Sequence, residues 1–462
     1  MARRDFPEVR GQRGVGGQPR DYGSRPMTRR DADAVIIGAG VIGAGVAYEL
    51  SRRGLATVSV ERLPGAGQGS TSSSSAVVRF NYSTRAGVAM AVEGLGYWLR
   101  WREHVAAPTG APVPEFVQCG MLVFKVPGAN HERAAEHFEA LGMPYQDLDR
   151  RELERRFPCL DARRFGPPTR MDDERFWAEP TGHIEGAIWM PEGGYVTDPM
   201  LAARNLADAA AALGGAFLYG RTVLGVLREG DRVAGVALDD GTELRAPVVV
   251  NVAGPHSSHI NRMAGLEGAA VISTRPMRRE VYVVPGPEGL DFDDAGCVMG
   301  DLDCGFYLRP ERPNNILIGS VEAACDELGW VAEPDAASLT LTRSEFETHV
   351  LRGARRIREL RLPHEQRGVV GVYDVTEDWL PIYDRTDLAG FYVAIGTSGN
   401  QFKNAAIAAH CMAELILDVE AGRDHDADPL VVQGPHLGLP IDLGTFSRNR
   451  PLDADAPVNV LG

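Results

Sequence analysis

Apolar and polar positions form three separate blocks along the chain, each with the pattern of strand–helix units. In the first, the apolar run 34–37 precedes a helical pattern over 41–53, and a second apolar run follows over 57–60. The second begins near Asp198 with an alanine-rich helix over 201–213 and strands over 233–238 and 244–252. The third has a strand over 391–395 and a helix from Asn400 to about Glu420. These patterns predict strand–helix units of a parallel sheet.

The stretches between the blocks have a different pattern. Short strands and charged helices mix over 115–185, alternation typical of antiparallel strands covers 270–320, and a charged helix follows over 343–360. The interleaving predicts an α/β fold with one nucleotide-binding domain built from residues 31–105, 190–268 and 366–423. A sheet-rich domain is inserted as residues 106–189 and 269–365. Residues 1–30 lack a hydrophobic period and are expected to be a disordered extension, and residues 424–462 a tail that wraps the surface.

Composition limits the partners. The chain has 462 residues and a net charge of −15, which argues against nucleic acid and anionic membranes as partners. The longest uncharged apolar stretch, 34–48, is too short for a membrane span, which needs about 20 residues. Six scattered cysteines form no CxxC pair, so we expect free thiols, no metal site and a cytoplasmic location. The chain has 46 arginines and only two lysines, Lys125 and Lys403. Because an ammonium and a guanidinium group are not equivalent, a position that keeps lysine is a candidate for a functional role.

A dinucleotide fingerprint lies in the first block. Gly38, Gly40 and Gly43 follow a strand and open a helix, and Glu61 ends the next strand. The glycines allow a tight turn, close approach to a diphosphate and close helix packing, while amides at the helix N-terminus bind the phosphates. Glu61 is placed to accept a hydrogen bond from a ribose hydroxyl. The fingerprint alone does not distinguish FAD from NAD.

Segments 38–61, 69–82 and 371–414, with Gly193–Pro199, resemble the D-amino-acid-oxidase superfamily of flavoenzymes, especially its sarcosine, dimethylglycine and glycine oxidase branch. The similarity covers roughly residues 33–420. It implies a Rossmann-type FAD-binding domain with an inserted antiparallel-sheet substrate domain. The FAD-binding residues implied by it and by the fingerprint are Gly38, Gly40, Val41, Ile42, Gly43, Glu61, Arg62, Gly69, Ser70, Thr71, Ser74, Gly254, Gly396, Ser398, Gly399, Asn400, Phe402 and Lys403.

The resemblance also implies a reaction. The branch oxidises a C–N bond of an amino acid to an imine that then hydrolyses, so we expect an amino-acid substrate with a secondary or N-substituted amine. Arg79 and Lys403 match the positions that bind the substrate carboxylate, and Tyr373 matches a tyrosine that reaches the substrate. Tyr307 is a further candidate for the substrate pocket. Packing roles for Arg79, Tyr373 and Tyr307, and a solvated helix position for Lys403, are the alternatives.

Departures from the family pattern concern the flavin. Gly371 stands where sarcosine oxidase has the cysteine attached to the flavin, and serines stand where dimethylglycine dehydrogenase has a histidine, so noncovalent FAD is expected. The region 270–285 contains no lysine to assist oxygen activation, so the electron acceptor can be O2 or another compound.

Two other functions are compatible with these residues. One is a flavin-carrying subunit of a heteromeric amine or opine dehydrogenase, without activity alone, and the other is an NAD-dependent enzyme. An oligomer is also compatible with the sequence.

Overall fold

A computed structural model describes residues 29–452 except 128, 130, 267, 269 and 271, together with Asn459 and Val460. The expected N-terminal extension therefore lies outside the described residues, apart from its last two. Arg29 and Arg30 belong instead to strand β1 (Arg29–Asp31), which pairs in parallel with β13 (Glu243–Arg245).

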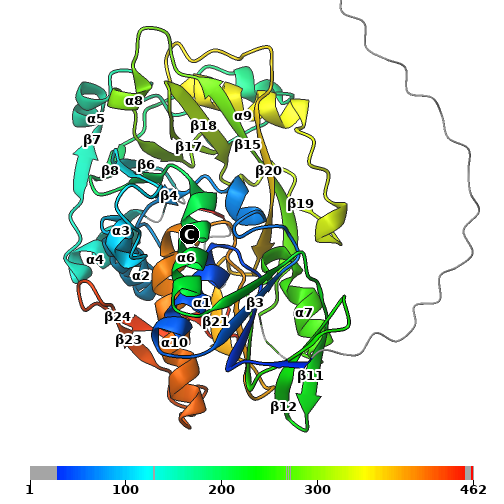
Figure 1. Cartoon of the computed structure of the whole chain (residues 1–462). Coiled ribbons are helices and arrows are strands. Elements are labelled where there is room, and N and C mark those ends of the chain that lie inside the picture. Colours follow the sequence, from blue (N-terminus) through cyan, green and yellow to red (C-terminus); the bar gives the residue numbers. More distant parts are fainter. Residues whose placement is uncertain are drawn as a thin grey trace, which may run out of the picture.

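The first large sheet has six strands in the order β10-β3-β2-β14-β22-β21. Its parallel members are β10 (Ala216–Tyr219), β3 (Thr57–Glu61), β2 (Ala34–Ile37), β14 (Val248–Asn251) and β22 (Phe391–Ile395), and β21 (Ile382–Arg385) is antiparallel. Every residue of β2, β14 and β22 is buried, because helices cover a parallel sheet on its faces. Helices α1 (Val41–Arg52), α6 (Pro199–Ala212) and α10 (Ala405–Glu420) lie side by side against this sheet (Figure 1). The predicted Rossmann-type unit is confirmed.

Two boundaries within this unit differ from the expectation. The strand expected over 244–252 is two strands, β13 and β14, separated by Pro247, which has no backbone N–H to donate. β13 joins the four-stranded sheet β1-β13-β12-β11, with β12 (Arg232–Leu238) and β11 (Val223–Glu229). The last helix begins at Ala405 rather than Asn400, because a 3₁₀ turn over Phe402–Asn404 precedes it.

The second large sheet has nine strands and is mostly antiparallel. Its main path is β19 (Gly329–Trp330), β15 (Arg275–Pro285), β18 (Asn315–Ser320), β17 (Phe306–Glu311), β16 (Val298–Asp301), β6 (Met121–Phe124), β8 (Gly186–Met190) and β7 (Gln146–Asp149). Helix α9 (Arg343–Arg356) packs on β18, β15 and β17. β20 (Gly368–Val375) pairs with β15 although it belongs to the third segment of the expected FAD-binding domain, so this strand links the two parts.

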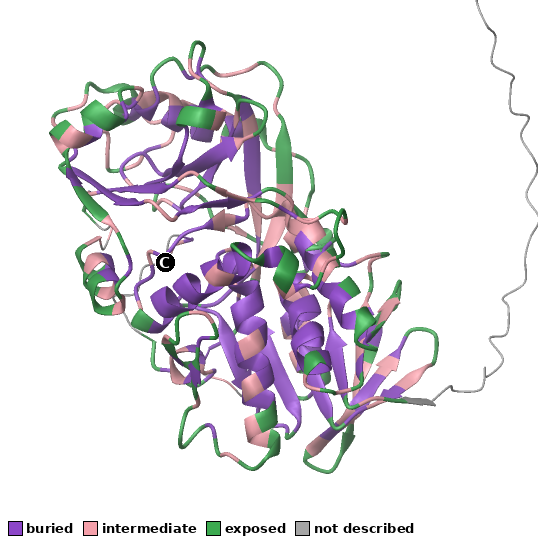
Figure 2. Cartoon of the chain, turned by 60° about the vertical axis from the view of Figure 1, so that its left-hand side comes forward, coloured by how far each residue is buried: buried purple, intermediate pink, exposed green. Residues whose placement is uncertain are grey.

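Figure 2 shows the two sheets as separate buried layers. A small three-stranded sheet brings distant segments together: β4 (Val77–Val78) and β5 (Phe116–Gln118) both pair with β9 (Gly194–Val196). Two further helices follow β4 along the chain, α2 (Arg85–Trp98) and α3 (Trp101–His104). The remaining helices are α4 (His131–Leu141), α5 (Arg150–Arg156), α7 (Ser257–Met263) and α8 (Phe292–Ala295). Among the helices that the structure describes, none has both the length and the apolarity that a bilayer crossing requires.

The C-terminal segment is packed into the molecule rather than only wrapped around it. β23 (Val431–Gln433) and β24 (Pro440–Asp442) form a hairpin, and Leu443 and Phe446 are buried in the first core. The buried carboxylate of Glu93 on α2 accepts hydrogen bonds from the amides of His436, Leu437 and Leu439. These contacts explain why a segment rich in proline and aspartate is ordered: its polar backbone has buried partners.

Candidate active site

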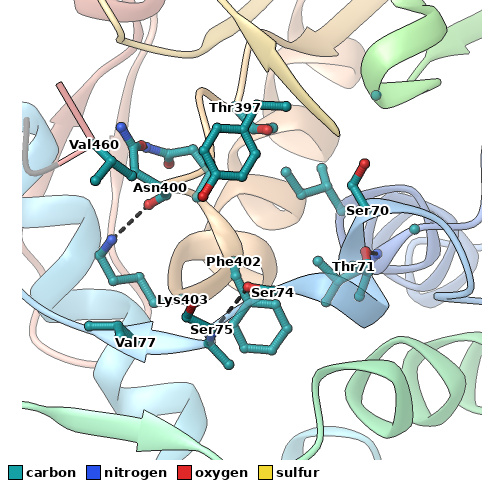
Figure 3. Close-up of a pocket in the computed structure, with 18 of the residues that line it drawn as sticks. Ser70, Thr71, Ser74, Ser75, Val77, Thr397, Asn400, Phe402, Lys403 and Val460 are labelled. Carbon is teal, nitrogen blue, oxygen red and sulfur yellow. Dashed lines mark hydrogen bonds between the residues drawn. The ribbon is translucent and has the colours of Figure 1, made fainter. Parts of the chain in front are cut away.

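A cavity of about 1130 Å³, including the open space at its mouth, lies between the two large sheets. Segments from both sheets and from their connections line it (Figure 3). The residues predicted from the sequence that line it are Gly40, Val41, Ile42, Gly43, Ser70, Thr71, Ser74, Arg79, Gly254, Tyr307, Tyr373, Gly399, Asn400, Phe402 and Lys403. Chain segments that are far apart in sequence therefore meet in one site.

The fingerprint glycines form one end of the cavity. A Cβ atom at Gly38, whose φ is +106°, would lie 2.5 Å from the carbonyl oxygen of Val252. At Gly43 a Cβ would lie 2.1 Å from the carbonyl oxygen of Gly38, so only glycine allows α1 to start this close to the strands. A Cβ at Gly40 would meet only the Thr71 hydroxyl, at 3.3 Å, so space for a ligand remains beside this residue. The N-terminus of α1 faces this space and is suited to bind a phosphate.

Glu61 ends β3 next to this turn. Its carboxylate accepts hydrogen bonds from the amide of Ala39, at 2.8 Å, and from the amide of Leu63, at 2.9 Å. Because a carboxylate oxygen can accept more than one hydrogen bond, Glu61 keeps acceptor capacity for a ribose hydroxyl. The two amides hold it at the strand end.

The loop from Gly396 to Phe402 forms part of the opposite wall. Buried Asp374 on β20 accepts hydrogen bonds from the Gly396 amide, at 2.6 Å, and from the Thr397 hydroxyl. Burial raises the pKa of the Asp374 carboxyl, and hydrogen bonds from Thr397 and Gly396 counteract this rise. Gly399 has φ +71°, and a Cβ there would lie 2.2 Å from the Tyr373 ring. Asp374 and Gly399 together define how the loop faces the cavity.

Segment 70–75 forms the floor between these ends. Its serine side chains bond mainly to backbone or to neighbouring hydroxyls: the Ser70 hydroxyl donates to the Val372 carbonyl at 2.6 Å, and Ser75 and Tyr307 share a hydrogen bond of 2.6 Å. The Thr71 hydroxyl accepts from the amide of Val41 at 3.1 Å. The run of serines is therefore a specific junction between the two sheets.

Arg79 and Lys403 are the two buried cations of the cavity, with 4% and 3% of their surface exposed. The Arg79 guanidinium donates to the carbonyls of Asn81 and Val460, and the Lys403 ammonium donates to the carbonyl of Asn400 at 2.7 Å. Both cations lie against the ring of Tyr82, 4.6 Å and 4.8 Å from its centre. Among the residues that the structure describes, neither cation forms an ion pair with a carboxylate.

The two cations also affect each other. Burial lowers the pKa of Lys403 well below its ordinary value, and the positive charge of Arg79 lowers it further. Burial likewise lowers the pKa of Arg79. A ligand carboxylate would compensate both positive charges, because charge-assisted hydrogen bonds are strong where water is excluded.

Six predicted residues lie outside the cavity lining: Gly38, Glu61, Arg62, Gly69, Gly396 and Ser398. Gly38, Glu61 and Gly396 shape the lining from behind, as described above. Arg62 instead pairs with Asp335 at 2.8 Å, on the surface. Lining residues that the sequence analysis did not select are Ser75, Ala76, Val77, Met121, Val252, Pro255, Val298, Met299, Val372, Asp374, Ala394, Thr397, Gln401 and Val460. Most are strand residues or neighbours of selected motifs, and only tertiary packing turns them toward the cavity.

A scan against family models matches residues 33–415 to the FAD dependent oxidoreductase family. The chain belongs to the FAD-dependent oxidoreductase family. The glycine oxidase of Geobacillus kaustophilus is 24% identical, over 86% of this chain and 96% of the relative. Sarcosine oxidase subunit beta of Rhodobacter capsulatus is 23% identical, over 85% of this chain and 86% of the relative. The L-proline dehydrogenase of P. horikoshii has the same fold, with a TM-score of 0.69 at 23% identity, over 86% of this chain and 95% of that one.

The cavity of this FAD-dependent oxidoreductase has the features that FAD requires. The glycine turn and the α1 N-terminus suit the diphosphate, Glu61 suits the ribose, and the Gly396–Phe402 loop lies beside the two buried cations at the far end. FAD bound there would supply the electron-accepting ring, as the cofactor does in flavoenzymes generally. The protein's own part is to hold that ring and to bind and orient what it oxidises.

Proposed function

We propose that this flavoenzyme oxidises the C–N bond of an amino acid with a secondary or N-substituted amine, whose carboxylate binds to Arg79 and Lys403. The supporting observation is the pair of buried cations, which share one wall of the cavity and have no described carboxylate partner. A buried positive charge without a counter-charge is costly, and a ligand carboxylate would relieve that cost. Relatives that act on glycine, sarcosine and L-proline, by their names, agree with such a ligand.

The residues would divide the work as follows. Arg79 and Lys403 bind the carboxylate, and Tyr82 supports both cations from one side. Tyr373 and Tyr307 line the neighbouring wall and restrict how the substrate lies. Asp374 holds the Gly396–Phe402 loop through the hydrogen bond that it accepts from the Gly396 amide. The substrate amine must be present as the free base before oxidation.

The first test is the absorbance spectrum of the purified protein before and after acid precipitation. Yellow colour that moves to the supernatant supports noncovalent FAD, and colour that stays in the pellet means that an attachment site other than position 371 exists. Amino acids are then screened for anaerobic bleaching of the colour and for aerobic peroxide, which separates an oxidase from a dehydrogenase with another acceptor. If Arg79→Ala and Lys403→Ala both leave substrate affinity unchanged, the proposed anchoring is wrong.

A second candidate is a flavin-carrying subunit of a heteromeric amine or opine dehydrogenase. One relative is a beta subunit, and a hydrogen cyanide synthase subunit of Pseudomonas protegens is 24% identical. This candidate predicts a stable hetero-partner on purification from the native cells and no turnover by the chain alone. Bleaching of the isolated chain by an amino acid at a catalytic rate would exclude it.

A further inference from the structure

Val460 joins two buried side chains of opposite charge. Arg79 donates a hydrogen bond to the Val460 carbonyl, and the Val460 amide donates to the Glu322 carboxylate at 2.8 Å. Val460 also lines the cavity, near Lys403 and Asn400 (Figure 3). A single residue thus connects the expected carboxylate anchor with an acid that the sequence analysis did not select.

The two hydrogen bonds of Val460 are spaced like the amino and carboxylate groups of an amino acid. In Val460 the amide nitrogen and the carbonyl carbon are separated by one Cα atom. The amino nitrogen and the carboxylate of any α-amino acid are separated by the same single carbon. Glu322 and Arg79 are therefore the right distance apart to bind the two ends of an α-amino acid.

The charges favour such a ligand over the segment that is there. The Glu322 side chain is 2% exposed, and Arg79 is 4% exposed. The neutral peptide groups of Val460 bring no negative charge to Arg79, whereas a ligand carboxylate would compensate its positive charge. The Glu322 carboxylate accepts the N–H of Val460 as it would accept an N–H of a substrate amine. The only described cation that pairs with Glu322 is Arg279, at 3.2 Å, and its Nε and Nη2 atoms have no hydrogen-bond partner among the described residues.

The position of Glu322 agrees with a site rather than with plain packing. It follows β18 and has a φ of +55°, a conformation that costs free energy in a residue other than glycine. The Ser320 hydroxyl accepts a hydrogen bond from the Glu322 amide at 2.9 Å and helps to hold this turn. Glu322 does not itself line the cavity, and its carboxylate reaches the cavity wall through Val460, which does.

We propose that Glu322 binds the amino group of the substrate while Arg79 binds its carboxylate, and that Val460 occupies this place until the substrate displaces it. This inference rests on the proposed function and adds the residue that recognises the amine. It restricts the substrate to α-amino acids, because a longer separation between nitrogen and carboxylate does not match the distance between the two anchors.

The test compares Glu322→Gln with the unaltered holoenzyme. The probes are the common amino acids in L and D form together with sarcosine, and, for whichever is oxidised, the carboxylic acid of the same shape without the nitrogen. For the amino acid we expect kcat/KM to fall about 10- to 100-fold, the range of a lost charged hydrogen bond. The inhibition constant of the nitrogen-free acid should change less than about twofold, because that acid binds only Arg79 and Lys403. Glu327→Gln, an exposed acid nearby, is the matched control and should change neither value.

A second variant keeps the test independent of the folding of Glu322→Gln. A chain that ends at Asn459 lacks the competing residue, so both the amino acid and the nitrogen-free acid should bind more tightly than to the full chain.

The role of Glu322 would be overturned if Glu322→Gln weakened the binding of both ligands equally, or if it changed neither. Unchanged affinities in the shortened chain would overturn the displacement of Val460. If no amino acid in the panel reduces the flavin in any of the proteins, the proposed function itself is wrong and this inference with it.

Discussion

Two buried arginines of this molecule have opposite surroundings. Arg356 on α9 is fully buried and donates to the carboxylates of Asp301, at 2.7 Å, and Asp303, at 2.9 Å. Arg79 is almost as buried, but among the described residues it donates only to the carbonyl groups of Asn81 and Val460. The two residues have the same side chain and similar burial, so the difference lies in the counter-charges.

The pKa values follow this difference. Burial acts to lower the pKa of Arg356, but the charges of Asp301 and its other acidic neighbours, together with the hydrogen bond to Asp301, outweigh burial and the pKa is raised. For Arg79 burial is not outweighed, and the pKa is lowered. A buried cation with its own carboxylates stabilises the fold around it, whereas one without them is available to a ligand.

Removing the structural arginine should have the largest effect. Arg356→Met leaves Asp301 and Asp303 buried without their cation, and we expect a loss of about 3–5 kcal/mol in the free energy of unfolding. Urea unfolding of the purified variant measures this loss. A loss below about 1 kcal/mol would contradict the assignment of Arg356 to the fold.

Removing the ligand-binding arginine should affect binding more than folding. Arg79→Met is expected to weaken the affinity for carboxylate ligands about 10- to 100-fold, because a charged hydrogen bond is lost. The free energy of unfolding should fall by only about 1–2 kcal/mol, since only neutral carbonyls lose their partner. Flavin absorbance changes on titration measure the affinity, and urea unfolding measures the stability. A stability loss as large as that of Arg356→Met would remove the distinction between the two arginines.

The smallest effect is a pH dependence that comes from Lys403. Its pKa is lowered on folding, so the unfolded chain binds one more proton between the lowered value and the ordinary value of 10.5. Stability therefore rises with pH in that window, by up to about 1.4 kcal/mol per pH unit. Lys403→Met abolishes this contribution.

Other titrating groups contribute equally to the stability of Lys403→Met and of the unaltered protein. The pH dependence of the difference between the two therefore comes from Lys403. The free energy of unfolding of Lys403→Met minus that of the unaltered protein should be larger at pH 7.5 than at pH 9.5. Both pH values lie below the ordinary lysine pKa of 10.5. Urea unfolding at both pH values measures it. A constant difference would mean that Lys403 keeps its ordinary pKa in the folded protein.

Sequence reasoning was accurate where neighbouring residues determine the conformation. β2 and β22 have the predicted bounds, and α1 ends one residue earlier than predicted. Hydrophobic period, the positive φ of Gly38 and the contact between Gly43 and the Gly38 carbonyl all act within a few residues, so they can be read directly from the chain. The strand break has a local signal in Pro247, which has no backbone N–H to donate, but the hydrophobic pattern alone does not show it. The late start of α10 depends on the geometry of the preceding loop.

The site was only partly predictable for the same reason. Lys403 and Arg79 were selected by motif, and the structure brings both into one cavity. Asp374 lies within a selected motif, next to Tyr373, but its bonds to Gly396 and Thr397 span more than twenty residues of chain. Its role becomes visible only when β20 and the loop are placed side by side.

The sequence by itself determined a dinucleotide turn, the interleaving of two sheets and the presence of two conspicuous basic residues. It did so because strand period, helix period and left-handed turns depend on local sterics and local hydrogen bonds. The tertiary structure decided which charges are paired. Arg79 meets a residue 381 positions away, and that residue meets Glu322 across 138 positions. Contacts at such separations arise from the packing of whole elements, and no local pattern of residues encodes them.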